Sequence, residues 1–76
     1  MEKVIEILEG IESDVDYKNC TTLIDDNYLD SLAIISLVAE LEEEFDIQIP
    51  TVEIIPDNFN SAEAIWKLVQ RMQEEG

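Results

Sequence analysis

Apolar residues recur at helical spacing over residues 31–45, and this stretch constrains the fold more than any other part of the chain. Apolar residues at every third or fourth position are typical of a helix that buries one face. The expected apolar stripe consists of Leu32, Ile35, Val38, Leu41 and Phe45, widened by Ile34 and Leu37. The sequence therefore predicts a helix from about Ser31 to Phe45.

The same spacing marks a helix near each end of the chain. The apolar face of a helix over residues 2–12 would consist of Val4, Ile7, Leu8 and Ile11. The last helix is expected to start at a cap formed by Asn60 or Ser61. It offers five residues to the core: Ala62, Ile65, Leu68, Val69 and Met72. Pro50 and Pro56 restrict residues 51–55 to a short turn before another helical piece.

A polar segment, residues 13–30, separates the first two helices and is long for a loop in a compact domain. Its apolar residues can anchor it to the core: Val15, Tyr17, Leu23, Ile24, Tyr28 and Leu29. We expect an ordered loop rather than a linker. With 76 residues, the chain has the length of one small domain, 1–76. The predicted fold is all-α, a small four-helix bundle with a long first loop and a short third helix.

The charge of the chain is strongly negative, with 19 acidic and 4 basic residues and a formal net charge of -15. Such a surface disfavours binding to nucleic acid or to anionic lipid, and it favours basic protein partners. The chain is nevertheless 46% apolar in regular patterns, so it differs from a disordered acidic tail. We expect it to fold, with charge repulsion at low salt.

The cellular location is suggested by what the sequence does not contain. Its single cysteine, Cys20, cannot form an internal disulfide, and the N-terminus lacks the features of a secretory signal. No apolar run approaches the roughly 20 residues that span a bilayer. We expect a cytoplasmic, monomeric protein that does not insert into membranes.

Catalysis by the chain itself is not expected. It has no histidine, so neither a Ser-His triad nor a Cys-His pair can be assembled. Asp14 and Asp16 have the spacing that opens a calcium-binding loop of the EF-hand type. Lys18 and Asn19, however, occupy the places of the next ligand and of the glycine. We expect no metal site.

Ser31 lies where an acidic loop meets the predicted helix, within Leu29-Asp30-Ser31-Leu32. Residues at a helix start leave backbone N–H groups unpaired and tolerate negative charge, so a phosphodiester on this hydroxyl would be accommodated. The alternative is that Asp30 or Ser31 only caps the helix.

The residues around Ser31 resemble those of acyl and peptidyl carrier proteins. The resemblance rests on Asp30-Ser31-Leu32 and on the Glu-rich helix that ends in Phe45-Asp46-Ile47-Gln48-Ile49-Pro50, and it covers nearly the whole chain. It implies the four-helix fold of that family and the attachment of 4′-phosphopantetheine, transferred from coenzyme A, to Ser31. The terminal thiol of this flexible arm would carry the cargo as a thioester, and the protein would be a non-catalytic carrier.

The resemblance also implies which residues the partner enzymes contact. Asp30 and Leu32 would be read by the phosphopantetheinyl transferase, although Asp30 can also cap the helix and Leu32 is expected to belong partly to the core. The expected docking face on the second helix consists of Ser36, Glu40, Glu43 and Glu44. Exposed ion pairs are individually weak, so docking through this face would be fast and sensitive to salt.

Two departures from the family pattern indicate the subtype. Ala33 and Ser36 stand where fatty-acid carriers tend to have acidic residues, and Asn27 stands where aminoacyl carriers often have glycine. Asparagine also accepts the left-handed conformation, so the turn can be retained. The chain most resembles free-standing aminoacyl carriers, including D-alanyl carriers. An adenylate-forming ligase would load it, and a downstream enzyme would accept the acyl or aminoacyl group.

A different class of function is an acidic helical interaction module without a prosthetic group. Such a module would bind a basic partner through its glutamates, and Ser31→Ala would leave that binding almost unchanged. In a carrier the same substitution would remove all loading.

Overall fold

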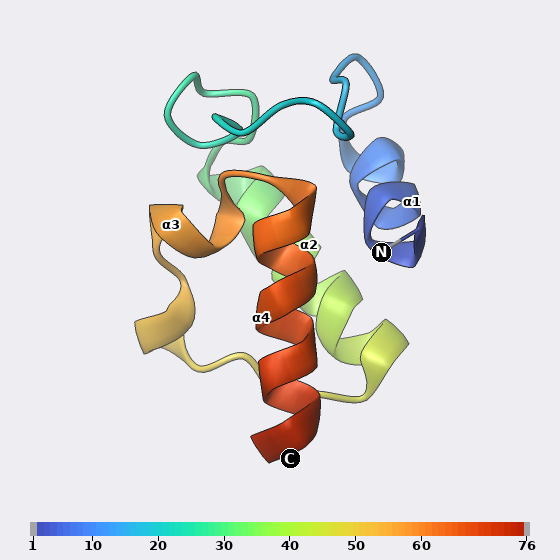
Figure 1. The fold of residues 1–76 in the computed structure, drawn as a ribbon, viewed down its shortest axis with the longest axis vertical. Coiled ribbons are helices and arrows are strands. Elements are labelled where there is room, and N and C mark those ends of the chain that lie inside the picture. The colour runs from blue at the N-terminus through green and yellow to red at the C-terminus, as the bar shows by residue number, and fades with distance from the viewer. Residues whose placement is uncertain (1, 76) are drawn as a thin grey trace.

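The computed structural model describes residues 2–75, and its regular elements in that range are all helical (Figure 1). In chain order these are α1 (Glu2–Ile11), α2 (Ser31–Phe45), the 3-10 helix η1 (Thr51–Glu53), α3 (Pro56–Phe59) and α4 (Ala62–Glu75). The predicted all-α class is confirmed over this range, with a long first loop and a short third helix. No helix among residues 2–75 is long and apolar enough to span a membrane.

Local signals set the ends of the helices. The Asp30 carboxylate accepts a hydrogen bond from the Ala33 N–H, at 2.8 Å, and so caps the start of α2. Asp46 ends α2 in the left-handed conformation, with φ of 52°. Pro56 occupies the start of α3, where its missing N–H costs nothing. The Ser61 hydroxyl accepts from the Ala64 N–H at 3.0 Å, so Ser61 rather than Asn60 caps α4.

The core forms where α1 packs against α2 and α4, and where α3 packs against α4. All five core residues predicted on α4 are buried. Burial of such apolar side chains is the main stabilising term for a small domain. The largest fully buried side chains are Val4, Leu8, Leu23, Leu37, Leu41, Phe59, Ile65, Leu68 and Val69.

The predicted buried face of α2 was partly wrong. Leu37 and Leu41 are buried, but Leu32 and Ile35 are 73% and 65% exposed. The first turns of α2 carry apolar residues all around the helix, so periodicity alone cannot fix which side faces the core. The structure buries the side centred on Leu37 and leaves a second apolar side in solvent.

The long loop, residues 12–30, is held down at several points. Tyr17, Leu23 and Leu29 are buried as predicted, whereas Tyr28 is 48% exposed and is not an anchor. Tyr28 comes directly after Asn27 in the chain. The φ of Asn27 is 60°, which gives the left-handed turn expected there. The buried residue after the turn is Leu29, which leaves Tyr28 at the surface.

Asn60 joins this loop to the start of α4. Its backbone oxygen accepts from the Leu23 N–H at 2.9 Å, and its side-chain oxygen accepts from the N–H groups of Ile24 and Asp25 at 3.0 and 3.1 Å. The side-chain amide also donates to the Asp25 carboxylate, at 3.3 Å. The prediction of an ordered loop is therefore confirmed, and Asn60 has a role other than capping.

Tyr17 makes the stability of this loop sensitive to pH. Its hydroxyl donates toward the carbonyl oxygens of Leu8 and Glu12 at the end of α1. Burial raises the pKa of Tyr17 from 10 to about 12, and the charges of Glu12 and Glu9 add to the effect. The stabilisation is complete below pH 10 and is lost as pH rises through 12, because the folded state favours the protonated hydroxyl.

We expect Tyr17→Phe to be less stable than the wild type by about 1 kcal/mol near neutral pH, because a buried hydrogen bond is lost. The difference should shrink between pH 10 and 12, because over this range the Tyr17 hydroxyl ionises in the unfolded wild-type chain while it stays protonated in the folded protein. Urea unfolding of both proteins at a series of pH values measures it. A difference that stays constant over this range would contradict the assignment.

Candidate modification site and partner face

Ser31 is exposed and occupies the first position of α2. The Asp30 cap directly before it fixes the start of the helix, so the position of the serine is set by local geometry. The helix N-terminus favours a negative group at this point. The site therefore offers a reachable hydroxyl in surroundings that tolerate an anionic substituent.

An apolar groove of about 330 Å³ opens beside Ser31. One wall is the first turn of α2, and the opposite wall is the segment that connects η1 to α3. The lining residues are Ile24, Ser31, Ile34, Ile35, Ile54, Ile55, Pro56 and Phe59. The groove was not predicted from the sequence. Its signal was the apolar pair Ile54-Ile55 between two prolines, in a segment too short to form a core helix.

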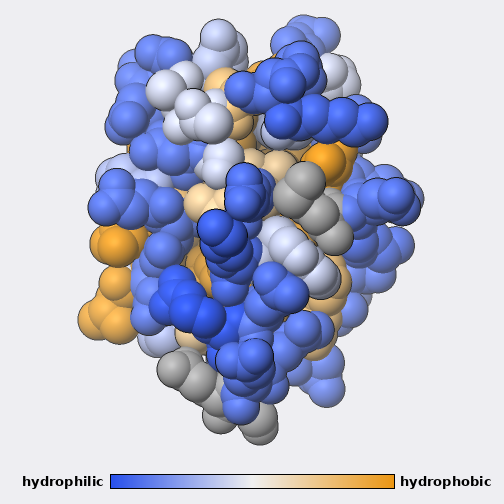
Figure 2. Space-filling view, viewed as in Figure 1, coloured by the Kyte–Doolittle hydropathy of each residue, from blue (hydrophilic) through white to orange (hydrophobic). Residues whose placement is uncertain are grey.

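Exposed apolar side chains also project from the elements that form the groove. Leu32 and Ile35 project from α2, and Val52, at 79% exposure, projects from η1. We call these three residues, together with Ile54 and Ile55, the apolar rim. Figure 2 shows hydrophobic side chains at the left edge, on the side where Figure 1 labels α3, against a largely hydrophilic surface. Exposed apolar patches of this kind mark interaction sites more often than isolated apolar residues do.

The polar residues predicted to face partners are all exposed on α2: Ser36, Glu40, Glu43 and Glu44. Glu44 is in an ion pair with Lys3, at 3.2 Å, but both side chains are about half exposed, so the pair is weak. Glu42, on the same helix, is partly buried instead and accepts from the Ile49 N–H at 2.8 Å. The structure thus separates glutamates available to partners from one that supports the fold.

Positive charge is scarce around the site. Ion pairs within the chain engage three of the four basic residues, namely Lys3, Lys67 and Arg71. None of the four lines the groove at Ser31.

Within residues 2–75 there is also no cluster of three or more His, Cys, Asp or Glu side chains that could hold a metal ion.

Leu32 and Asp30 lie on either side of the serine, and only Leu32 has different surroundings from those expected. The expectation that Leu32 belongs partly to the core is wrong, because the side chain is 73% exposed. It lies on the side of α2 that points away from Leu37 and Leu41, and it is available to a partner. Asp30 is exposed as well, but its carboxylate is engaged in the helix cap.

Loss of the cap in Asp30→Ala should lower the free energy of unfolding by about 1 kcal/mol. Asp30→Asn keeps a side-chain oxygen that can accept from the Ala33 N–H, so its stability should remain near that of the wild type. Urea unfolding of the three proteins tests this prediction. Wild-type stability in Asp30→Ala would show that the cap contributes little. With stability controlled in this way, slow modification of Asp30→Asn would assign recognition to the carboxylate.

These features define a class of protein: a small helical protein that presents one exposed serine, beside an apolar groove, on an acidic surface. The sequence profile of the family described as "Phosphopantetheine attachment site" matches residues 3–69. The chain therefore belongs to this phosphopantetheine-binding family. It is a non-catalytic carrier protein, and its prosthetic group is covalently attached 4′-phosphopantetheine.

Curated relatives agree over most of the length. The chain is 39% identical over 72 residues to a D-alanyl carrier protein of Streptococcus sanguinis (strain SK36), covering 93% of this chain and 91% of the relative. It is 41% identical over 66 residues to a D-alanyl carrier protein of Listeria monocytogenes serotype 4b (strain CLIP80459), covering 84% and 85%. No solved structure gives a significant match to this chain.

Proposed function

We propose that Ser31 is the attachment residue for 4′-phosphopantetheine and that the loaded protein carries an aminoacyl group, with D-alanine as the cargo. The observation that carries the proposal is the exposed hydroxyl of Ser31 at the first position of α2, opening onto the apolar groove. The names of the two relatives support the choice of cargo.

The residues around Ser31 fit this prosthetic group. The N-terminus of α2 favours the negative charge of a phosphodiester. The isoleucines of the groove can contact the apolar atoms of the prosthetic group that lie close to the serine. No basic side chain lines the groove, so none there would hold the phosphate against the protein. When bound, the group supplies a thiol at the end of a flexible chain, which carries cargo as a thioester at high effective concentration to successive enzymes.

The proposed partners are a phosphopantetheinyl transferase, an adenylate-forming ligase and a downstream enzyme that accepts the aminoacyl group. The apolar rim would form the centre of each contact, and four exposed residues of α2 would form its polar border: Ser36, Glu40, Glu43 and Glu44. An apolar centre with a polar border is the usual organisation of protein interfaces. We also propose that the carrier is a monomer and that it acts in the cytoplasm.

Intact mass spectrometry tests the attachment. The purified protein is measured before and after incubation with coenzyme A, Mg²⁺ and a permissive phosphopantetheinyl transferase. We expect a gain of one phosphopantetheine, which peptide mapping places on Ser31. No gain on a folded protein that carries no arm at the start, with several transferases, would contradict the proposal.

The cargo is tested separately on the modified protein. Incubation with ATP and an adenylate-forming ligase specific for D-alanine should add one D-alanyl group, and L-alanine should not replace it. Failure to load from D-alanine, with another amino acid loaded by its own ligase, would retain the carrier function and reject D-alanine as the cargo.

A further inference from the structure

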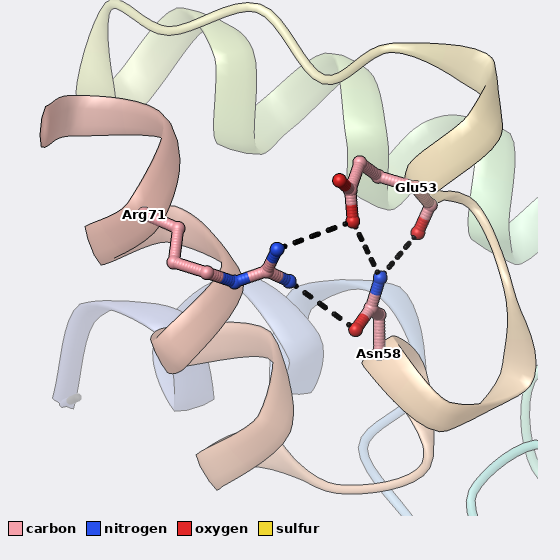
Figure 3. Close-up of polar contacts among 3 residues, drawn as sticks. All are labelled: Glu53, Asn58 and Arg71. Carbon is pink, nitrogen blue, oxygen red and sulfur yellow. Dashed lines mark hydrogen bonds and ion pairs between the residues drawn. The ribbon is translucent and has the colours of Figure 1, made fainter. Parts of the chain in front are cut away.

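Three polar side chains from three elements, η1, α3 and α4, meet at the surface (Figure 3). Arg71 on α4 places Nη1 3.4 Å from Oε1 of Glu53 and donates from Nη2 to Oδ1 of Asn58 at 3.3 Å. Asn58 Nδ2 donates to the backbone oxygen of Glu53 at 2.7 Å and to its Oε1 at 3.1 Å. Each of the three residues therefore contacts the other two.

Two residues of this cluster, Glu53 and Asn58, lie at the two ends of the segment that forms one wall of the groove. Glu53 is the last residue of η1 and Asn58 lies in α3, so the residues between them are those that face Ser31 across the groove, including Ile54 and Ile55. The hydrogen bonds from Asn58 to Glu53 hold the two ends of this segment together. The contacts of Arg71 connect both ends to α4. The side chains of Ile54 and Ile55 are exposed, so their burial alone does not fix the segment.

We propose that Arg71 is a positioning residue, which holds the η1–α3 wall of the groove in place beside Ser31 and so maintains the surface that partner enzymes contact. The inference rests on the proposed function of Ser31. Without the Arg71 contacts, the polar connection between this wall and α4 is lost. The wall would then open more often, and the apolar rim would no longer be presented as one surface.

The chemistry of arginine suits this role. Its planar guanidinium reaches two acceptors at once, the Glu53 carboxylate and the Asn58 amide oxygen. A lysine at this position would keep the charge but could not bind both acceptors in the same geometry.

Lys67 provides a matched control. It lies one helical turn before Arg71 on the same helix, and its ion pair, with Glu63 at 3.3 Å, stays within α4. Lys67→Ala and Arg71→Ala each remove one positive charge from α4, so their long-range electrostatic effects are similar. Only Arg71→Ala removes the connection to the wall.

Hydrogen exchange reports how often the wall opens locally. The N–H groups of Glu53, Ile54, Ile55 and Asn58 are hydrogen-bonded within residues 50–58, so they exchange when this segment opens. We expect Arg71→Ala to speed their exchange by about twofold to fivefold, since a partly exposed ion pair is weak. Lys67→Ala should exchange as the wild type does, and Arg71→Lys should lie between wild type and Arg71→Ala.

Kinetics of the transferase provide the functional readout. Arg71→Ala should raise the apparent KM for the carrier and leave kcat unchanged, because the serine and its helix start are intact. Lys67→Ala should retain the wild-type KM. A merely structural role for Arg71 would loosen the fold without this separation of KM from kcat.

The outcomes are distinct. Faster exchange confined to the wall, together with a raised KM, supports the inference. Unchanged exchange, or faster exchange spread along α4, would overturn it, and so would a loosened wall with a wild-type KM. If the wild type accepts no arm at all, the function of Ser31 fails, whereas the exchange experiment still decides whether Arg71 holds the wall.

Discussion

Ser31→Ala is expected to abolish the addition of phosphopantetheine completely, because the substitution removes the only oxygen to which the phosphodiester can be joined at this position. The change is made at an exposed residue whose side chain is not needed for the cap, which Asp30 provides. Stability should therefore stay within about 0.5 kcal/mol of the wild type. Intact mass after incubation with coenzyme A and the transferase, alongside urea unfolding, measures both effects.

Ser36→Ala is the appropriate control. Ser36 is an exposed serine on the same helix, so its substitution removes a hydroxyl of the same kind without affecting the helix start. We expect Ser36→Ala to be modified fully, although its rate can change if the transferase contacts this side chain. Modification of a folded Ser31→Ala protein would show that another residue carries the arm and would refute the assignment.

The largest expected effect on stability comes from Phe59→Ala. Phe59 is 1% exposed at the end of α3, and it also lines the groove. Removing a buried phenyl ring costs about 3–5 kcal/mol, from lost apolar burial and from the cavity left behind. A domain of this size has a total stability of roughly 4–11 kcal/mol, so the variant should be close to unfolding at room temperature. Urea unfolding followed by circular dichroism measures the loss.

Val52→Ala is the matched control for Phe59→Ala. Val52 also lies on the η1–α3 side of the groove, but its side chain is 79% exposed. The free energy of unfolding of Val52→Ala should therefore differ from the wild-type value by less than about 0.5 kcal/mol. Phe59→Leu should fall between the two, because much of the buried volume is kept. A mild effect of Phe59→Ala would mean that α3 contributes little to the core.

The parts of the fold that could be predicted from the sequence are those with local causes. Asp30 before the apolar stretch indicated the start of α2, and the spacing of Ala62, Ile65 and Val69 indicated the buried face of α4. These signals act within a few residues, so they do not depend on how the helices pack.

The orientation of α2 and the groove depend on packing, and the sequence left them open. Leu32 and Leu37 are equally apolar, and only the positions of α1 and α4 decide that Leu37 is buried. Arg71 and Glu53 are 18 residues apart in different elements, and no spacing rule connects them. The exposed serine could be predicted because it combined a local signal, the helix start, with a motif that resembles a known family.

Asn60 has a consequence for how cargo can travel. Its side chain holds consecutive backbone N–H groups of the loop that leads to Ser31, and it ties that loop to the start of α4. In the proposed carrier the tether is joined to the protein at a fixed point, because Asn60 holds the loop before Ser31 and the Asp30 cap fixes the start of the helix that follows. Travel between active sites must then come from rotation about the bonds of the tether and from tumbling of the whole protein between encounters. The length of the tether sets its reach, and the way the protein docks sets its direction.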